Sequence, residues 1–140
     1  MSARVFQTNS EEETVALGRK LSADFRSPCV VLLIGNLGAG KTTLAKGIVE
    51  GLGAASRDEV SSPTFPLIHQ YSKGVYHIDL YRLETEREVA TLGLDELFEE
   101  NAVLLIEWGE RFRHLLPKRR AEISLLAHAD SRTIGLEWRS

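Results

Sequence analysis

The sequence has a single cysteine, Cys29, so a disulfide cannot form within the chain. Only four of its 140 residues are proline and 43% are hydrophobic, a composition that argues against disorder. It has no apolar run of the roughly 18 residues that a membrane span needs. Its start, MSARVFQTNSEEE, has no basic stretch leading into an apolar segment, as a secretory signal would. We therefore expect a soluble, cytoplasmic protein without a membrane partner.

An excess of charge of one sign is also missing. The 17 basic and 20 acidic residues give a net charge of -3. Such a chain has no broad positive field to hold an extended nucleic acid. One local basic cluster is formed by Arg111, Arg113, Lys118, Arg119 and Arg120. It is either a solvated face or a docking patch for an acidic partner.

Strand and helix patterns alternate along the chain. The apolar runs CVVLLI and AVLLI predict strands that are buried on both faces. A capping box of Ser10 and Glu13 precedes an amphipathic helix that is expected from about Glu11 to Arg26, and KTTLAKGIVEGLG predicts a second helix. With 140 residues, the chain is long enough for one domain and too short for two, so residues 1–140 are expected to form one domain.

Three further segments complete the expected fold. FPLIHQY and VYHIDLY predict a hairpin across SKG, and a closing hairpin is expected around ADSR. Two short helices are expected in TEREVATLGLDELFEE and one in GERFRHLL. The sequence therefore predicts the α/β class, with a mixed, mostly parallel sheet flanked by helices.

One glycine-rich stretch carries a chemical motif. GNLGAGKT fits the phosphate-binding pattern GxxxxGK[ST] through Gly35, Gly40, Lys41 and Thr42. It leaves a predicted buried strand and opens a predicted helix, so backbone N–H groups and the helix N-terminus can converge on a phosphate. Lys41 would neutralise the β- and γ-phosphates, and the Thr42 hydroxyl would bind Mg²⁺. The sequence thus predicts a P-loop NTPase-like domain.

A P-loop also needs a carboxylate on the metal side of the site. Glu107 ends VLLIE and Asp79 ends VYHID, and each is expected at the carboxyl end of a strand, where open α/β sheets bind ligands. We assign Glu107 to the magnesium shell, directly or through water. Asp79 either joins that shell or orients the attacking water.

Four neighbouring features remain open or are set aside. Trp108 either packs over the nucleotide site or is a core residue. SSPTF, residues 61–65, is either a loop that reorganises around a γ-phosphate or an ordinary connection. His69 and His77 are expected to be structural histidines rather than ligands, because no nearby residues give metal-site spacing.

Several classes of P-loop protein lack support in the sequence. There is no NKxD or DxxG motif, which weakens a guanine-specific GTPase and favours ATP as the nucleotide. There is no LSGGQ-type signature of transporter ATPases. A small-molecule kinase would need an arginine-rich lid and a basic acceptor site, and the basic cluster lies late in the chain for that purpose.

GNLGAGKTT, SSPTF, HIDLYRL, GLDELF and LIEWGER, in this order and spacing, resemble the TsaE family, formerly YjeE. These are bacterial ATPases of tRNA threonylcarbamoyladenosine (t⁶A) biosynthesis, and the resemblance covers nearly the whole chain. It implies a small P-loop fold that binds ATP and Mg²⁺ and works with the partners TsaB and TsaD on t⁶A37 of tRNA. In that family TsaD carries the transfer site, and the small ATPase supports repeated turnover.

The resemblance also assigns residues by position. It places Lys41, Thr42 and Thr43 on phosphate and metal, Glu107 in the magnesium shell and Asp79 as the aspartate needed for activity. The nucleotide-binding residues expected from motif and resemblance together are Ser10, Gly35, Leu37, Gly38, Ala39, Gly40, Lys41, Thr42, Thr43, Trp108 and Arg132. Lys41, Asp79 and Glu107 are expected to be catalytic, with Thr42 and Glu107 as metal ligands. Asn36 departs from the family, where an aspartate is usual in GDLGAGKTT.

Charge and motif together shape the functional expectation. Because the chain is net acidic, we expect tRNA to be reached only indirectly, through partners that hold it. No residue resembles an arginine finger or a water-positioning glutamine, so ATP hydrolysis by the isolated chain is expected to be slow. Two alternatives remain: a small-molecule P-loop kinase, and a nucleotide-gated binding module without essential hydrolysis.

Overall fold

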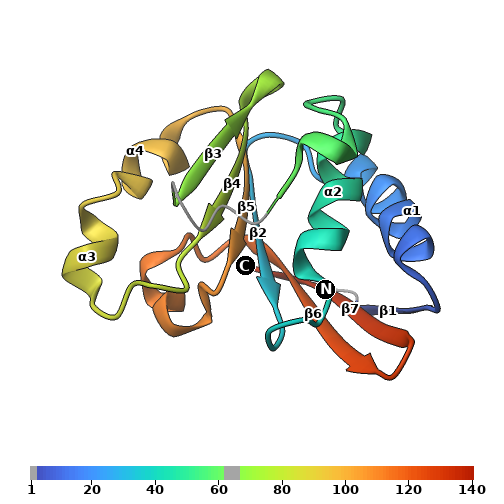
Figure 1. Cartoon of the computed structure of the whole chain (residues 1–140). Coiled ribbons are helices and arrows are strands. Elements are labelled where there is room, and N and C mark those ends of the chain that lie inside the picture. The colour runs from blue at the N-terminus through green and yellow to red at the C-terminus, as the bar shows by residue number, and fades with distance from the viewer. Residues whose placement is uncertain (1–2, 62–66) are drawn as a thin grey trace.

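The computed structural model of the chain describes residues 3–61 and 67–140 and arranges them around one mixed sheet (Figure 1). The order of the strands across the sheet is β1-β7-β6-β2-β5-β4-β3. The strands are β1 (Ala3–Thr8), β2 (Cys29–Ile34), β3 (Ile68–Tyr71), β4 (Val75–Asp79), β5 (Val103–Glu107), β6 (Arg120–His128) and β7 (Ser131–Arg139). The α-helices are α1 (Glu11–Leu21), α2 (Lys41–Gly51), α3 (Glu86–Ala90) and α4 (Leu94–Glu99).

The centre of the sheet is parallel. β2 pairs in parallel with both β5 and β6, and β4 pairs in parallel with β5. The outer pairs β3–β4, β6–β7 and β1–β7 are antiparallel, so β1 points the same way as the four central strands. Most of the sheet therefore runs in one direction, which confirms the predicted α/β class with a mixed, mostly parallel sheet.

Helices cover both faces of the sheet. α1 and α2 lie on one side of the central strands, and α3 and α4 lie on the other (Figure 1). Leu44 and Ile48 of α2 are fully buried against Val31 and Leu33 of β2. The opposite face buries a second cluster, in which Ile106 of β5 takes part. The sheet thus separates two apolar layers, as the continuous apolar strands predict.

α1 and α2 approach each other closely. A Cβ added to Gly47 of α2 would lie 2.0 Å from the carbonyl oxygen of Val15 in α1. A Cβ added to Gly18 of α1 would lie 2.5 Å from the carbonyl oxygen of Leu44. Only residues without a side chain allow the two backbones to come so near. This contact fixes α1 beside the helix that follows the P-loop.

Most predicted elements are confirmed, with local differences. α1 begins as expected, since Ser10 caps it by accepting from the Glu13 N–H, but it ends at Leu21 and continues as the 3₁₀ helix Ser22–Asp24. The Glu13 carboxylate accepts from the Asn9 N–H at 2.8 Å, one residue before the cap. The expected helix in GERFRHLL is the 3₁₀ helix Glu110–Leu115. Strand β1 was not predicted.

Two further points concern the limits of the fold. In the SSPTF segment, residues 62–65 lie outside the described residues, so its expected reorganisation stays a prediction. Within the part of the chain that the structure describes, none of the helices combines the length and the apolar character that a bilayer crossing requires.

Candidate functional site

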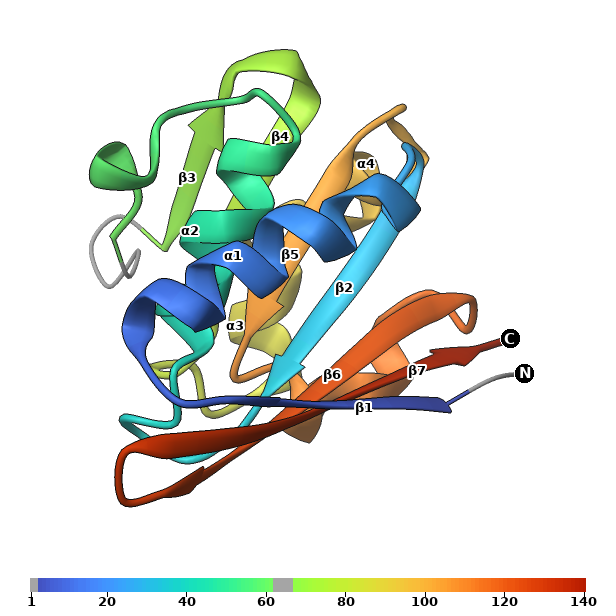
Figure 2. The same ribbon diagram turned by 90° about the vertical axis from the view of Figure 1, so that its right-hand side faces the viewer.

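The predicted P-loop connects β2 to α2 at the carboxyl end of the parallel strands. Gly40 is the N-cap of α2 and has a φ of 104°, a left-handed value that favours glycine. The loop tightens through a hydrogen bond from the Ala39 N–H to the Asn36 carbonyl at 3.0 Å. Leu37 is largely exposed, whereas Ala39 is buried. Figure 2 shows this loop beside the β6–β7 hairpin.

A cleft of about 840 Å³ opens at the loop. Its wall includes the whole set of residues expected to bind nucleotide or act in catalysis, except Gly35 and Ala39, which lie in the loop itself. Further lining residues, which the sequence did not indicate, are Asn9, Glu11, Thr14, Tyr81, Ala129 and Asp130. The N-terminal part of α1, the ends of β4 and β5, and the β6–β7 hairpin therefore surround one cavity of ligand size.

Lys41 is buried at the base of this cleft. Its Nζ donates to the Gly35 carbonyl at 2.6 Å and lies 3.3 Å from the centroid of the Trp108 ring. Burial lowers the pKa of Lys41, and the negative charges of Glu107, Glu110 and Asp79 oppose that change. Lys41 is thus a buried lysine at the base of the cleft, between the P-loop backbone and the Trp108 ring.

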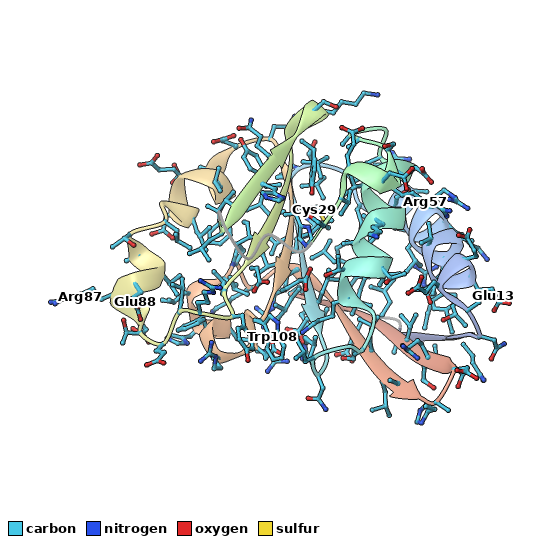
Figure 3. All side chains as sticks on the ribbon, in the orientation of Figure 1. Glu13, Cys29, Arg57, Arg87, Glu88 and Trp108 are labelled. Atoms are coloured by element: carbon cyan, nitrogen blue, oxygen red, sulfur yellow. The ribbon has the colours of Figure 1, made fainter. Side chains whose placement is uncertain are left out.

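Trp108 follows directly after β5 and covers Lys41. Its φ is 62°, which is strained for a bulky residue and costs on the order of 1–3 kcal/mol. The ring also meets Tyr81 edge to face, with centroids 4.9 Å apart. Figure 3 places Trp108 near the ends of the central strands, far from Cys29 at the start of β2. Trp108 therefore lines the cleft, and its expected closeness to a nucleotide stays a prediction.

The two predicted carboxylates meet at the same edge of the sheet. Asp79 of β4 and Glu107 of β5 are paired in register, and both are buried. Thr42 Oγ1 donates toward Glu107, at 3.1 Å from Oε2 and 3.4 Å from Oε1. Asp79 Oδ1 accepts from the Tyr81 N–H at 2.8 Å. The structure therefore brings the P-loop hydroxyl and both carboxylates together.

This donor set fits Mg²⁺ that arrives with a phosphate. Among residues 3–61 and 67–140, no cluster of three or more His, Cys, Asp or Glu could hold a metal ion by itself. Magnesium is usually held by one or two carboxylates together with waters and substrate phosphates. Thr42 and Glu107 offer hard oxygen atoms at one point of the cleft, which is what such a shared site requires.

Ser10 and Arg132 reach the cleft from two sides. Ser10 lines it from the start of α1, where its side chain also caps the helix. Arg132 lines it from β7 and donates to the carbonyls of Ala129 and Ser131. A Cβ built on Gly40 would lie 3.5 Å from Arg132 Nε, so this guanidinium stands next to the P-loop.

His77 does not line the cleft but contacts Glu107, and its burial agrees with the expected structural role. It is fully buried on β4, and its Nε2 lies 2.5 Å from Glu107 Oε2. In the sequence, its position two residues before Asp79 was the available signal, because alternate residues of a strand share one face. The partner on the neighbouring strand could not be read from that spacing.

Most of the predicted basic cluster has internal partners. Arg111 donates to the carbonyls of Leu80, Tyr81 and Leu83 and so ties down the turn after Asp79. Separately, the buried Glu122 pairs with three guanidinium groups, those of Arg113, Arg120 and Arg139. Burial raises the pKa of Glu122, but hydrogen bonds from these arginines outweigh that effect. The pKa of Glu122 is therefore lowered overall. Much of the positive charge of the basic cluster is therefore paired with groups of the chain itself.

Several known proteins are similar to this chain. Residues 8–134 match the family model described as "Threonylcarbamoyl adenosine biosynthesis protein TsaE". A relative from Bacillus subtilis (strain 168), "tRNA threonylcarbamoyladenosine biosynthesis protein TsaE", is 45% identical over 129 residues, which cover 89% of this chain and 78% of the relative. A relative of the same name from Haemophilus influenzae is 38% identical over 110 residues, 76% of this chain and 68% of the relative.

A solved structure shares the fold as well. The crystal structure of Bacillus subtilis YdiB aligns with a TM-score of 0.80 and 34% identity, covering 99% of this chain and 87% of that chain. Sequence family, relatives and three-dimensional similarity thus lead to one assignment. The chain belongs to the TsaE family.

Proposed function

We propose that the chain is the ATP-binding and ATP-hydrolysing component of the machinery that makes t⁶A37 in tRNA, and that it supports repeated turnover by TsaB and TsaD. One observation carries the proposal. Lys41, Thr42, Asp79 and Glu107 converge on a single cleft at the carboxyl end of a parallel sheet. This is where open α/β sheets bind ligands, and the residues are of the types that triphosphate and Mg²⁺ need.

Each residue has a distinct task in this proposal. Backbone N–H groups of the P-loop and the N-terminus of α2 receive the phosphates, and Lys41 neutralises their charge. Thr42 and Glu107 hold Mg²⁺, which when bound offsets the negative charge of the phosphate oxygens. Trp108 and Tyr81 form an aromatic wall that limits access of water to Lys41.

Asp79 is the candidate for positioning the attacking water. Its Oδ1 is held by the Tyr81 N–H, and Arg111 holds the carbonyl of Tyr81 in turn. Such fixation suits phosphoryl transfer, which depends mainly on positioning and charge stabilisation. Among the described residues, Arg132 is the only arginine that lines the cleft, and its guanidinium donates to the carbonyls of Ala129 and Ser131 instead of serving as an arginine finger. Slow hydrolysis by the isolated chain, accelerated by the partner proteins, follows.

Charge supports indirect contact with tRNA. The net charge is -3, and Arg113, Arg120 and Arg139 already pair with Glu122. TsaB and TsaD would therefore hold the tRNA, while this chain cycles through ATP in the same cytoplasmic complex.

A reconstituted t⁶A assay tests the proposal. With purified TsaB and TsaD, product should stop near one turnover without this chain and continue past it when the chain and ATP are added. Asp79→Asn separates hydrolysis from binding: we expect ATP and partner binding to persist while product stops near one turnover. Undiminished product with Asp79→Asn would favour the nucleotide-gated module instead.

The kinase alternative has its own assay. A small-molecule P-loop kinase would consume ATP in proportion to an added metabolite, with no need for partner proteins. Release of ADP is measured with the chain alone, against a panel of metabolites. We expect no stimulation by any of them, whereas strong stimulation by one would replace the proposed function with a kinase.

A further inference from the structure

His77 was expected to be a structural histidine, and in the described structure it contacts a carboxylate of the candidate site. Its side chain is fully buried on β4, and the Nε2 atom lies 2.5 Å from Glu107 Oε2 on the adjacent strand β5. Glu107 is itself only 2% exposed. A carboxylate that binds a metal ion is ionised and can only accept hydrogen bonds, so in the proposed metal site the imidazole donates from Nε2.

Packing alone does not account for a histidine at this position. Among the described residues, His77 Nδ1 is buried without a hydrogen-bond partner. An unsatisfied buried polar atom destabilises the fold, and an aliphatic side chain would avoid that cost. Its strand neighbours Val75 and Ile78 are aliphatic and buried. The hydrogen bond to Glu107 is thus what an imidazole provides here and an aliphatic side chain could not.

Two elements hold the Glu107 carboxylate from different sides. Thr42 Oγ1, at the start of α2, lies 3.1 Å from Oε2 and 3.4 Å from Oε1. His77 holds Oε2 from β4. In the proposed function, the Thr42 hydroxyl turns to Mg²⁺ and no longer donates to Glu107. Among residues 3–61 and 67–140, the hydrogen bond from His77 is then the one that still fixes the carboxylate.

We propose that His77 is a positioning residue for the metal side of the site, because its Nε2–H keeps the Glu107 carboxylate turned toward Thr42. The inference rests on the proposed function, in which Thr42 and Glu107 hold Mg²⁺. Removal of a hydrogen bond that orients a metal-binding group typically lowers metal affinity 10–100-fold. The effect should therefore fall on the magnesium-dependent part of ATP binding.

Two amide substitutions distinguish orientation from packing. In His77→Gln, the amide nitrogen takes the approximate place of Nε2 and can still donate to Glu107. In His77→Asn, the shorter side chain places its amide nitrogen near the position of Nδ1, away from Glu107. His77→Leu removes the donor and keeps an apolar side chain. His69→Leu is the matched control, because His69 faces His77 in register on β3 and its ring contacts Tyr71.

The experiment measures ATP affinity by titration calorimetry, once with Mg²⁺ and once with EDTA, for the wild-type chain and the four variants. We expect the gain in affinity from Mg²⁺ to fall 10–100-fold in His77→Leu and His77→Asn, with unchanged affinity in EDTA. His77→Gln and His69→Leu should keep a gain within about threefold of wild type. If His77→Leu does not fold, the comparison of Gln with Asn decides.

Three results would overturn the inference. They are equal gains from Mg²⁺ in the Gln and Asn variants, a parallel loss of affinity in Mg²⁺ and in EDTA, and a loss in His69→Leu as large as that in His77→Leu. A different result would reject the proposed function instead: no effect of Mg²⁺ on ATP affinity in the wild-type chain.

Discussion

Asp79 and Glu107 stand side by side as register partners at the ends of the parallel strands β4 and β5, and only 4% and 2% of their surfaces are exposed. Two buried carboxylates so close together repel each other unless positive charge is near. Lys41, at the start of α2, supplies one such charge. A divalent ion beside Thr42 would supply more. The carboxylate pair therefore indicates that this edge of the sheet binds a cation or a charged ligand.

Replacement of Lys41 tests the phosphate side of the site. In Lys41→Met, the apolar contact with Trp108 is largely kept but the positive charge is lost, so ATP affinity should fall on the order of 100-fold, about 3 kcal/mol.

Lys46→Met, on the same helix, is the matched control for charge and should bind ATP like wild type. Titration calorimetry measures the affinities of both variants. Equal affinities in Lys41→Met and Lys46→Met would show that Lys41 does not contact the nucleotide.

The contact between α1 and α2 gives a stability prediction. Gly47→Ala places a methyl group against the Val15 carbonyl, where a Cβ would lie at 2.0 Å, so the helices must separate. Overpacking of this kind costs roughly 1–3 kcal/mol, although alanine favours the helix itself. Denaturant unfolding should show that loss. Gly135→Ala on β7 serves as the control, because an added Cβ has no atom within 4 Å. A stability loss no larger in Gly47→Ala than in Gly135→Ala would contradict the close helix contact.

Cys29 gives a prediction for alkaline pH. Burial raises the pKa of its thiol to about 11, against an opposing effect of Arg119. Since the folded-state value lies above the unfolded one, near 9, the thiol's contribution to stability is complete below about pH 9 and is lost as pH rises toward 11. The free energy of unfolding of wild type should fall by on the order of 2 kcal/mol more than that of Cys29→Ala across this range. Parallel curves for the two proteins would exclude a buried, neutral thiol.

Direct binding of tRNA should be weak. The chain is net acidic, and three of its arginines, Arg113, Arg120 and Arg139, pair with Glu122. Gel-shift titration of the isolated chain at moderate salt should therefore show no saturable complex, whereas TsaB and TsaD together should retain tRNA. Tight, saturable binding by the chain alone would mean that it carries a tRNA surface of its own.

Local patterns predicted much of the fold and the core of the site. The apolar runs of β2 and β5 and the motif that ends in Lys41 and Thr42 depend on neighbours in sequence, so they could be recognised directly. β1 was missed because most of its residues are exposed, and its pairing with β7 joins the two ends of the chain.

The contact of His77 with Glu107 could not be predicted, for a related physical reason. Its partner Glu107 lies thirty residues away and becomes a neighbour only through the register of β4 with β5. The extent of α1 differed because the last predicted turn, with Phe25 still buried, forms a 3₁₀ helix. Contacts set by tertiary packing could not be deduced from spacing alone.

The binding of ATP to the purified chain, measured by calorimetry with Mg²⁺ and again with EDTA, tests the central claim most directly. If Lys41, Thr42 and Glu107 form a triphosphate site, ATP binds with one-to-one stoichiometry and the affinity falls when Mg²⁺ is removed. If no magnesium-dependent ATP affinity appears, even with TsaB and TsaD present, the cleft is not a nucleotide site and the proposed function is wrong.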